Sequence, residues 1–162
     1  MSVDLRVAHT VAAPPDVVWP VLVDWAGQAR WIPFTTVRVV SDHQEGLGVR
    51  CEALSGFWLR GVPVGLLDRF TVTAWRVPSD AGSGILEVLH TGPYFRGPGT
   101  FELAPTAGGG TTVSGTEIFD VVGGALPTRL AGLLLPLMRV GFATSLRALG
   151  KVSLSELSLA GR

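Results

Sequence analysis

Hydrophobic and polar residues alternate at the start of the chain, over residues 3–11. Val3, Leu5, Val7 and Val11 all fall on odd positions. This period of two is typical of a strand that buries one face. The pattern therefore predicts that the fold begins with a strand.

A helix is predicted to follow this strand directly. Pro15 suits the first helical position, where its missing N–H costs nothing, and Asp16 favours the positive end of the helix dipole. The next apolar residues recur at helical spacing: Val17, Val18, Val21, Leu22 and Trp25. A short helical turn is expected between this stripe and Pro33.

Six further stretches have the pattern of strands and are separated by turns that contain glycine or proline. They lie at residues 36–42, 49–54, 69–77, 85–91, 99–104 and 111–121. Short connections of this kind join antiparallel neighbours. Residues 56–67 break the pattern, because Phe57 and Trp58 stand among glycines, and we interpret this stretch as a loop that covers the mouth of a cavity.

The period changes to 3.6 from Leu126 to about Leu157, which predicts a long C-terminal helix. Pro136 should kink or restart this helix, because it lacks an N–H and its ring clashes with the preceding turn. Four basic residues fall on one broad stripe, namely Arg129, Arg139, Arg147 and Lys151. Five others lie roughly opposite and are expected to face inward: Leu134, Met138, Phe142, Ser145 and Leu149.

The composition indicates an apolar interior larger than usual. Hydrophobic residues make up 47% of the 162 residues and charged residues 16%, against about 25% charged in an average domain. A lined cavity would account for the difference. The length suits a single domain over residues 1–162. The formal net charge of +0 argues against a nucleic-acid partner.

The location is predicted to be the cytoplasm. The single cysteine, Cys51, cannot form an internal disulfide, and the first residues lack the pattern of a signal peptide. Residues 130–142 are apolar but shorter than the ~20 residues that a membrane span needs. No transmembrane segment is therefore expected.

The order of elements and several short motifs resemble the polyketide cyclase and START-like lipid-transport (SRPBCC) superfamily. The motifs are Ala13-Pro14-Pro15, Val18-Trp19, Leu22-x-Asp24, Trp31-x-Pro33, Gly46-x-Gly48, Gly99-x-Phe101 and Gly110-Thr111-x-Val113. The resemblance covers nearly the whole chain, but its motifs are structural and include no catalytic signature. It implies an α+β helix-grip fold, in which a curved seven-stranded antiparallel sheet wraps around a long C-terminal helix. Two short helices would follow the first strand, and a ligand cavity would lie between sheet and helix.

Three polar residues fall where alternation predicts hydrophobic ones, namely His9, His90 and Glu117. In the implied topology the first and last strands are neighbours, so Val3 near Val121 would bring His9 within reach of Glu117. Such a pair could transfer protons in an enolisation or cyclisation. It could equally be a structural pair or lie in water at the rim of the sheet.

Eight residues are candidates for contact with a ligand, because they are aromatic, flexible or polar and lie near the expected cavity. They are Phe57, Trp58, His90, Tyr94, Phe95, Phe101, Met138 and Phe142. Met138 and Phe142 could instead be ordinary core residues, and His90 a core residue bonded to a carbonyl. No metal or cofactor is predicted, because the histidines and the cysteine lack ligand spacing and no phosphate-binding loop occurs.

Three functions remain open from the sequence. The first is the binding or transport of a hydrophobic small molecule, polyketide-like, aromatic or lipid-like, in the cavity. The second is a polyketide cyclase, aromatase or dehydratase that uses Glu117 and a histidine for proton transfer. The third is a protein-interaction module with a filled core. The oligomeric state is not predicted.

Overall fold

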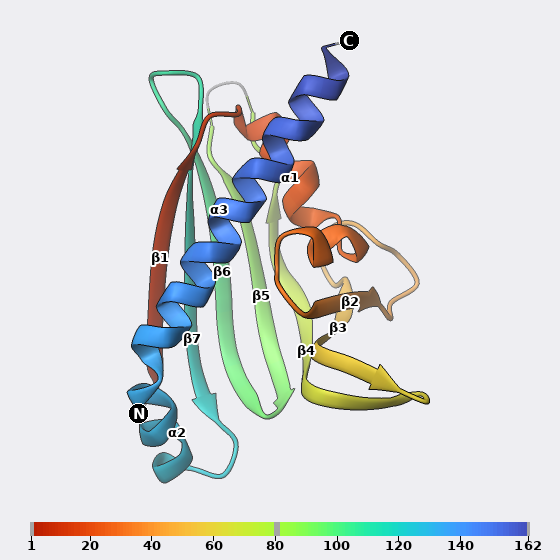
Figure 1. The fold of residues 1–162 in the computed structure, drawn as a ribbon, viewed down its shortest axis with the longest axis vertical. Coiled ribbons are helices and arrows are strands. Elements are labelled where there is room, and N and C mark those ends of the chain that lie inside the picture. The colour runs from red at the N-terminus through yellow and green to blue at the C-terminus, as the bar shows by residue number, and fades with distance from the viewer. Residues whose placement is uncertain (1, 80–81, 162) are drawn as a thin grey trace.

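The computed structural model describes residues 2–79 and 82–161, without the side chains of Phe57, Trp58 and Pro63. One antiparallel sheet of seven strands curves behind a long helix that runs diagonally across it (Figure 1). Two short helical segments follow the first strand and lie beside the upper part of the long helix. This is the predicted helix-grip arrangement.

The sheet has the strand order β1-β7-β6-β5-β4-β3-β2. Its strands are β1 (Val3–Val11), β2 (Thr35–Val39), β3 (Arg50–Leu59), β4 (Val62–Arg76), β5 (Gly84–Pro93), β6 (Phe95–Pro105) and β7 (Thr111–Val121). Every neighbouring pair is antiparallel, and all but the β1–β7 pair are consecutive in the chain. The first and last strands pair as the resemblance implied.

The prediction of a loop at residues 56–67 is wrong. β3 and β4 continue through this stretch and pair from Arg50 opposite Thr71 to Leu59 opposite Val62. They form a hairpin that projects away from the rest of the sheet (Figure 1). Gly56 and Gly65 lie opposite each other, and a Cβ on Gly56 would come within 2.1 Å of the Val64 carbonyl. The glycines therefore allow close backbone approach within a ladder rather than breaking it.

The helices are α1 (Pro15–Val23), a 3₁₀ helix η1 (Ala26–Arg30), α2 (Ala125–Leu133) and α3 (Leu135–Ala160). Pro136 lies in the first turn of α3, so it restarts the helix as predicted. Within the described ranges no single helix is long and apolar enough to cross a membrane. Only α2 and α3 taken together, across a bend of 64°, reach that length and composition.

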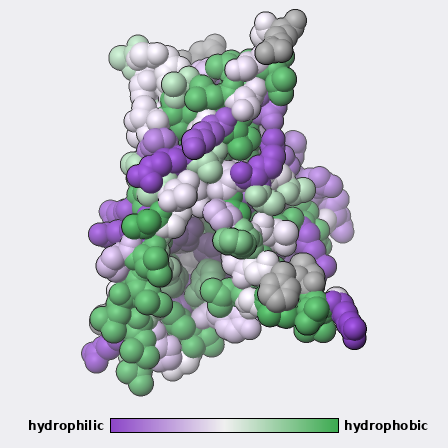
Figure 2. Space-filling view, in the orientation of Figure 1, coloured by the Kyte–Doolittle hydropathy of each residue, from purple (hydrophilic) through white to green (hydrophobic). Residues whose placement is uncertain are grey.

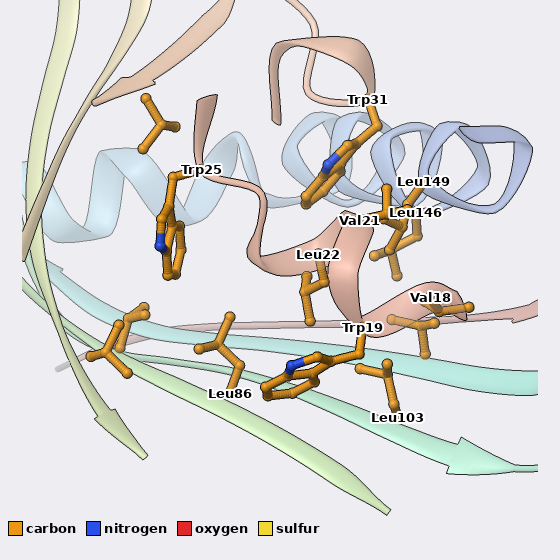
Figure 3. Packing of buried hydrophobic residues seen from close by; sticks show 14 of the residues in the cluster. Val18, Trp19, Val21, Leu22, Trp25, Trp31, Leu86, Leu103, Leu146 and Leu149 are labelled. Atoms are coloured by element: carbon orange, nitrogen blue, oxygen red, sulfur yellow. The ribbon is translucent and has the colours of Figure 1, made fainter. Parts of the chain in front are cut away.

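The hydrophobic core lies where α1 and the second half of α3 meet the sheet. Trp19 and Leu22 of α1 pack with Leu86 and Leu103 of the strands and with Leu149 of α3 (Figure 3). All five are at most 5% exposed. The core therefore closes one end of the sheet, and the space between sheet and helix at the other end is left for a cavity.

Candidate functional site

A cavity of about 340 Å³ lies between the sheet, η1 and the middle of α3. Most of its wall is apolar and includes Trp25, Trp31, Val88, Phe101 and Phe142. The molecular surface is hollowed at this position, and hydrophilic residues lie deep in the hollow (Figure 2). This volume is in the range of small-molecule sites, which are mostly apolar with a few placed polar groups.

Three ionisable side chains meet on one wall of this cavity. The Nδ1–H of His90 donates a hydrogen bond to Oδ2 of Asp68 at 2.7 Å. On the other side of the ring, Nε2 of His90 lies 3.1 Å from Oε2 of Glu117. This is an ion-pair distance, although the N–H is not aligned as a hydrogen bond. His90 therefore bridges two carboxylates, and we call the three residues the histidine–carboxylate cluster.

The positions of these side chains follow from strand pairing. His90 on β5 lies opposite Phe70 on β4, and Asp68 is two residues before Phe70, so both face the cavity. On the other side of β5, His90 lies opposite Gly97 of β6. Glu117 lies on β7, which is separated from β5 by β6, so its side chain must cross β6 to reach His90.

Glycine in β6 lets Glu117 reach His90 across an intervening strand. Gly99 pairs with Glu117, and a Cβ at Gly99 would lie 2.6 Å from Oε2 of that carboxylate. Any larger residue would push the carboxylate away. At Gly97 the strand has a φ of 146° and a Cβ would come 2.0 Å from the Ile118 carbonyl. Gly97 and Gly99, on either side of the exposed Pro98, thus leave this part of β6 without a side chain at two positions close to β7.

The carboxylates hold His90 in its charged form. Burial lowers the pKa of the imidazole, but its contacts with Asp68 and Glu117 and their negative charges outweigh burial and raise the pKa from 6.5 to about 10. The rings of Phe70 and Phe95 have centroids 5.8 and 5.3 Å from that of His90, close enough to favour a cation. At neutral pH the cavity therefore contains an imidazolium between two carboxyl groups.

The predicted contact between His9 and Glu117 is wrong. Val3 pairs with Phe119 rather than with Val121, so Leu5 lies opposite Glu117 and His9 lies opposite Val113. His9 is four residues along the strand from the position beside Glu117, or roughly 13 Å at ~3.3 Å per residue. The histidine beside Glu117 is His90.

The candidate ligand contacts divide into three groups. The structure places His90, Phe95, Phe101 and Phe142 on the cavity wall. Tyr94 is 47% exposed and Met138 is half-buried, and neither is among the described residues that line the cavity. The side chains of Phe57 and Trp58 lie outside the described part of the structure.

Asp68 was missed because residues 56–67 were interpreted as a loop. The inward residues of β4 alternate through Val72 and Phe70, and one more step back along the same face reaches Asp68. This alternation could have identified Asp68 as an inward-facing residue from the sequence. Trp31 was also missed, although its indole lines the cavity and its Nε1 has no hydrogen-bond partner among the described residues.

The single cysteine, Cys51, is buried in the core. Burial raises the pKa of the Cys51 thiol to about 12, so this cysteine is not a thiolate nucleophile at neutral pH. Within residues 2–79 and 82–161, no three histidine, cysteine or acidic side chains are arranged to hold a metal ion. The hydroxyls of Thr35 and Ser55, which also line the cavity, bond each other at 3.0 Å.

Solved structures with the same fold cover nearly the whole chain. The protein TTHA0849 from Thermus thermophilus is 21% identical, with a TM-score of 0.69, over 94% of this chain and 98% of that one. The Zhui aromatase/cyclase from Streptomyces sp. R1128 is 19% identical, with a TM-score of 0.69 over 99% of each chain. The hypothetical protein jhp0584 from Helicobacter pylori is 14% identical, with a TM-score of 0.72 over 94% and 88%. At these identities the likeness shows the fold alone.

The family of the chain follows from its match to a family model rather than from these structures. No curated protein matches the chain. The model described as "Polyketide cyclase / dehydrase and lipid transport" matches residues 2–153. Because this match spans almost the entire sequence, and the helix-grip sheet and cavity agree with it, the chain belongs to the polyketide cyclase/dehydrase and lipid-transport family.

Proposed function

We propose that this protein binds a hydrophobic small molecule, polyketide-like, aromatic or lipid-like, in the cavity between the sheet and α3. The observation that carries the proposal is an apolar cavity of about 340 Å³ with one charged cluster on its wall. Burial of apolar ligand surface supplies affinity at ~25 cal/mol per Å². The cluster orients the polar end of the ligand.

The cluster favours a ligand with a hydrogen-bonding group, such as a carbonyl or a hydroxyl. Among its members Glu117 has the most exposed side chain, at 21%, against 10% for His90 and 11% for Asp68. A ligand hydroxyl therefore meets the Glu117 carboxylate first. Nε2–H of His90 lies behind it, buried and without an aligned hydrogen bond, so it would reach a ligand carbonyl only where the Glu117 carboxylate moves aside.

Filling the cavity should weaken binding without damage to the fold. Ala53 is half-buried and lines the cavity from β3, so in Ala53→Phe a phenyl ring occupies space that the ligand needs. We expect the affinity for N-phenyl-1-naphthylamine, measured by energy transfer from Trp25 and Trp31, to fall at least about tenfold, or ~1.4 kcal/mol.

The matched control is Ala8→Phe, at an exposed position of β1 that does not line the cavity. It should bind the probe as the wild-type chain does. Equal binding by both variants would place the probe elsewhere and would overturn the cavity as the binding site.

Proton-transfer catalysis is the second candidate, because Glu117 and His90 are in contact at the cavity wall. The raised pKa of His90 makes it an acid rather than a base at neutral pH. Glu117 would then accept a proton from the carbon beside a substrate carbonyl, while the positive charge of His90 stabilises the enolate that forms. Unchanged turnover of a bound poly-keto substrate by Glu117→Gln would eliminate this candidate.

A further inference from the structure

A continuous set of large apolar side chains is exposed where α2 meets α3. Leu126, Leu130 and Leu133 of α2 are 69%, 55% and 75% exposed. Leu137 and Val140 of α3 are 70% and 63% exposed, and Leu134 at the bend is 57% exposed. We call these six residues the leucine surface. It appears as a concentration of hydrophobic residues at the lower left of Figure 2.

The leucine surface is not explained by packing within the chain. Leu134 was expected to face inward, but the 64° bend turns α2 away from the long axis of α3. Thr128 anchors α2 through its hydroxyl, which accepts a hydrogen bond from the Val121 backbone N–H at 3.0 Å. α2 is thus held against the end of β7 with its leucines pointing outward. Exposed apolar patches of this kind mark interaction sites.

The basic residues around the leucine surface indicate which kind of partner it binds. From residue 121 to residue 155 the chain contains Arg129, Arg139, Arg147 and Lys151 and no acidic residue. All four basic residues are exposed. Asp4 is paired with Arg6 at 2.9 Å and also lies within electrostatic reach of Arg139, and Asp120 lies opposite Arg96 in the sheet. An apolar face bordered by cations is typical of helices that lie in the interface of anionic membranes.

The tip of the β3–β4 hairpin is also apolar and basic. It lies in the lower half of the molecule, as the leucine surface does (Figure 1). Leu59 and Val62 are 57% and 61% exposed, and Arg60 between them is exposed as well. The hollow in the surface opens between this hairpin and the leucine surface (Figure 2). Two apolar, basic elements therefore flank the entrance to the cavity.

We propose that the leucine surface docks this protein onto membranes that contain anionic lipids, with α2 and the first turns of α3 lying in the interface. A second copy of the chain fits less well. A symmetric contact would place the same patch against itself and bring Arg129 and Arg139 of the two copies together. The docking does not depend on the proposed function, because it uses residues outside the cavity.

Flotation of the full chain with lipid vesicles tests this docking. We expect binding to vesicles of phosphatidylcholine mixed with phosphatidylglycerol and little binding to phosphatidylcholine alone. Binding should weaken in about 1 M salt, where the Debye length falls to ~3 Å. Arg129→Gln should lower the affinity roughly fivefold, since each basic residue near an anionic surface contributes about that factor.

The double variant Leu133→Glu/Leu137→Glu should lower binding at least about tenfold, because it places charges on the face that enters the interface. Both positions are exposed, so the melting temperature should not fall. The matched control is Leu159→Glu, 67% exposed at the far end of α3, which should bind as the wild type does. Equal binding to both vesicle types, or a dimer in sedimentation that Leu137→Glu abolishes, would overturn the proposal.

Discussion

The Asp68→Asn variant is expected to unfold with about 3 kcal/mol less free energy than the wild-type chain at neutral pH. Asp68 and His90 are both buried, and their hydrogen bond at 2.7 Å joins a carboxylate to an imidazolium. Removal of one partner from a buried ion pair leaves the other poorly compensated, which typically costs ~3–5 kcal/mol. We place the loss at the low end because Glu117 remains beside the ring. Urea denaturation measures it.

The matched control is Asp4→Asn. Asp4 is paired with Arg6 at the surface, where the two side chains are 50% and 67% exposed, and exposed pairs contribute little. We expect no measurable change in this variant. If Asp68→Asn were equally harmless, His90 would not be charged in the folded protein, and our description of the cluster would be wrong.

Stability should also fall as the pH rises from about 6.5 to about 9. In the unfolded chain a histidine loses its proton near pH 6.5, whereas the pKa of folded His90 is raised to about 10. In this window the folded state binds one proton more than the unfolded state, so the free energy of unfolding decreases by up to ~1.4 kcal/mol per pH unit. Over the window the expected loss is about 3 kcal/mol. The stabilisation is fully present below pH 6.5 and is lost by about pH 10.

Measurement of urea denaturation at several pH values checks this dependence. His90→Gln should remove most of the slope, while His43→Gln, at an exposed histidine, should keep it. The window ends at pH 9, near the ordinary pKa of a thiol. Above it the buried Cys51, with a pKa raised to about 12, adds a pH dependence of its own. A wild-type chain with constant stability from pH 6.5 to 9 would contradict the charged state of His90.

The first and last strands, β1 and β7, were predicted with their full bounds, because each alternates cleanly and is bounded by clear turns. Their register was not. Val3 pairs with Phe119 rather than Val121, a shift of two residues. A shift of one would move every hydrophobic side chain to the wrong face, but a shift of two keeps each on its face. Hydrophobic pattern therefore identified the inward residues and could not say which histidine lies beside Glu117.

The cluster itself depends on contacts between strands that are far apart in the sequence. Its assembly needs Asp68 of β4, His90 of β5 and Glu117 of β7, with Gly99 of β6 leaving space between them. The hydrophobic pattern of a strand shows which of its residues face inward. It does not show that Gly99 on β6 leaves room for the side chain of Glu117 on β7. The orientation of α2 likewise depends on a contact that the hydrophobic pattern does not reveal, the hydrogen bond from the Val121 backbone N–H to the Thr128 hydroxyl.

The central claim is that the cavity beside His90 holds a hydrophobic small molecule. Native mass spectrometry of the protein purified from its own host tests this claim most directly, with the Ala53→Phe and Ala8→Phe variants measured alongside. We predict a reproducible additional mass on the wild-type and Ala8→Phe chains that is displaced by organic solvent, and its loss from Ala53→Phe. A wild-type chain that never has such a mass, or an Ala53→Phe chain that retains it, would contradict the claim.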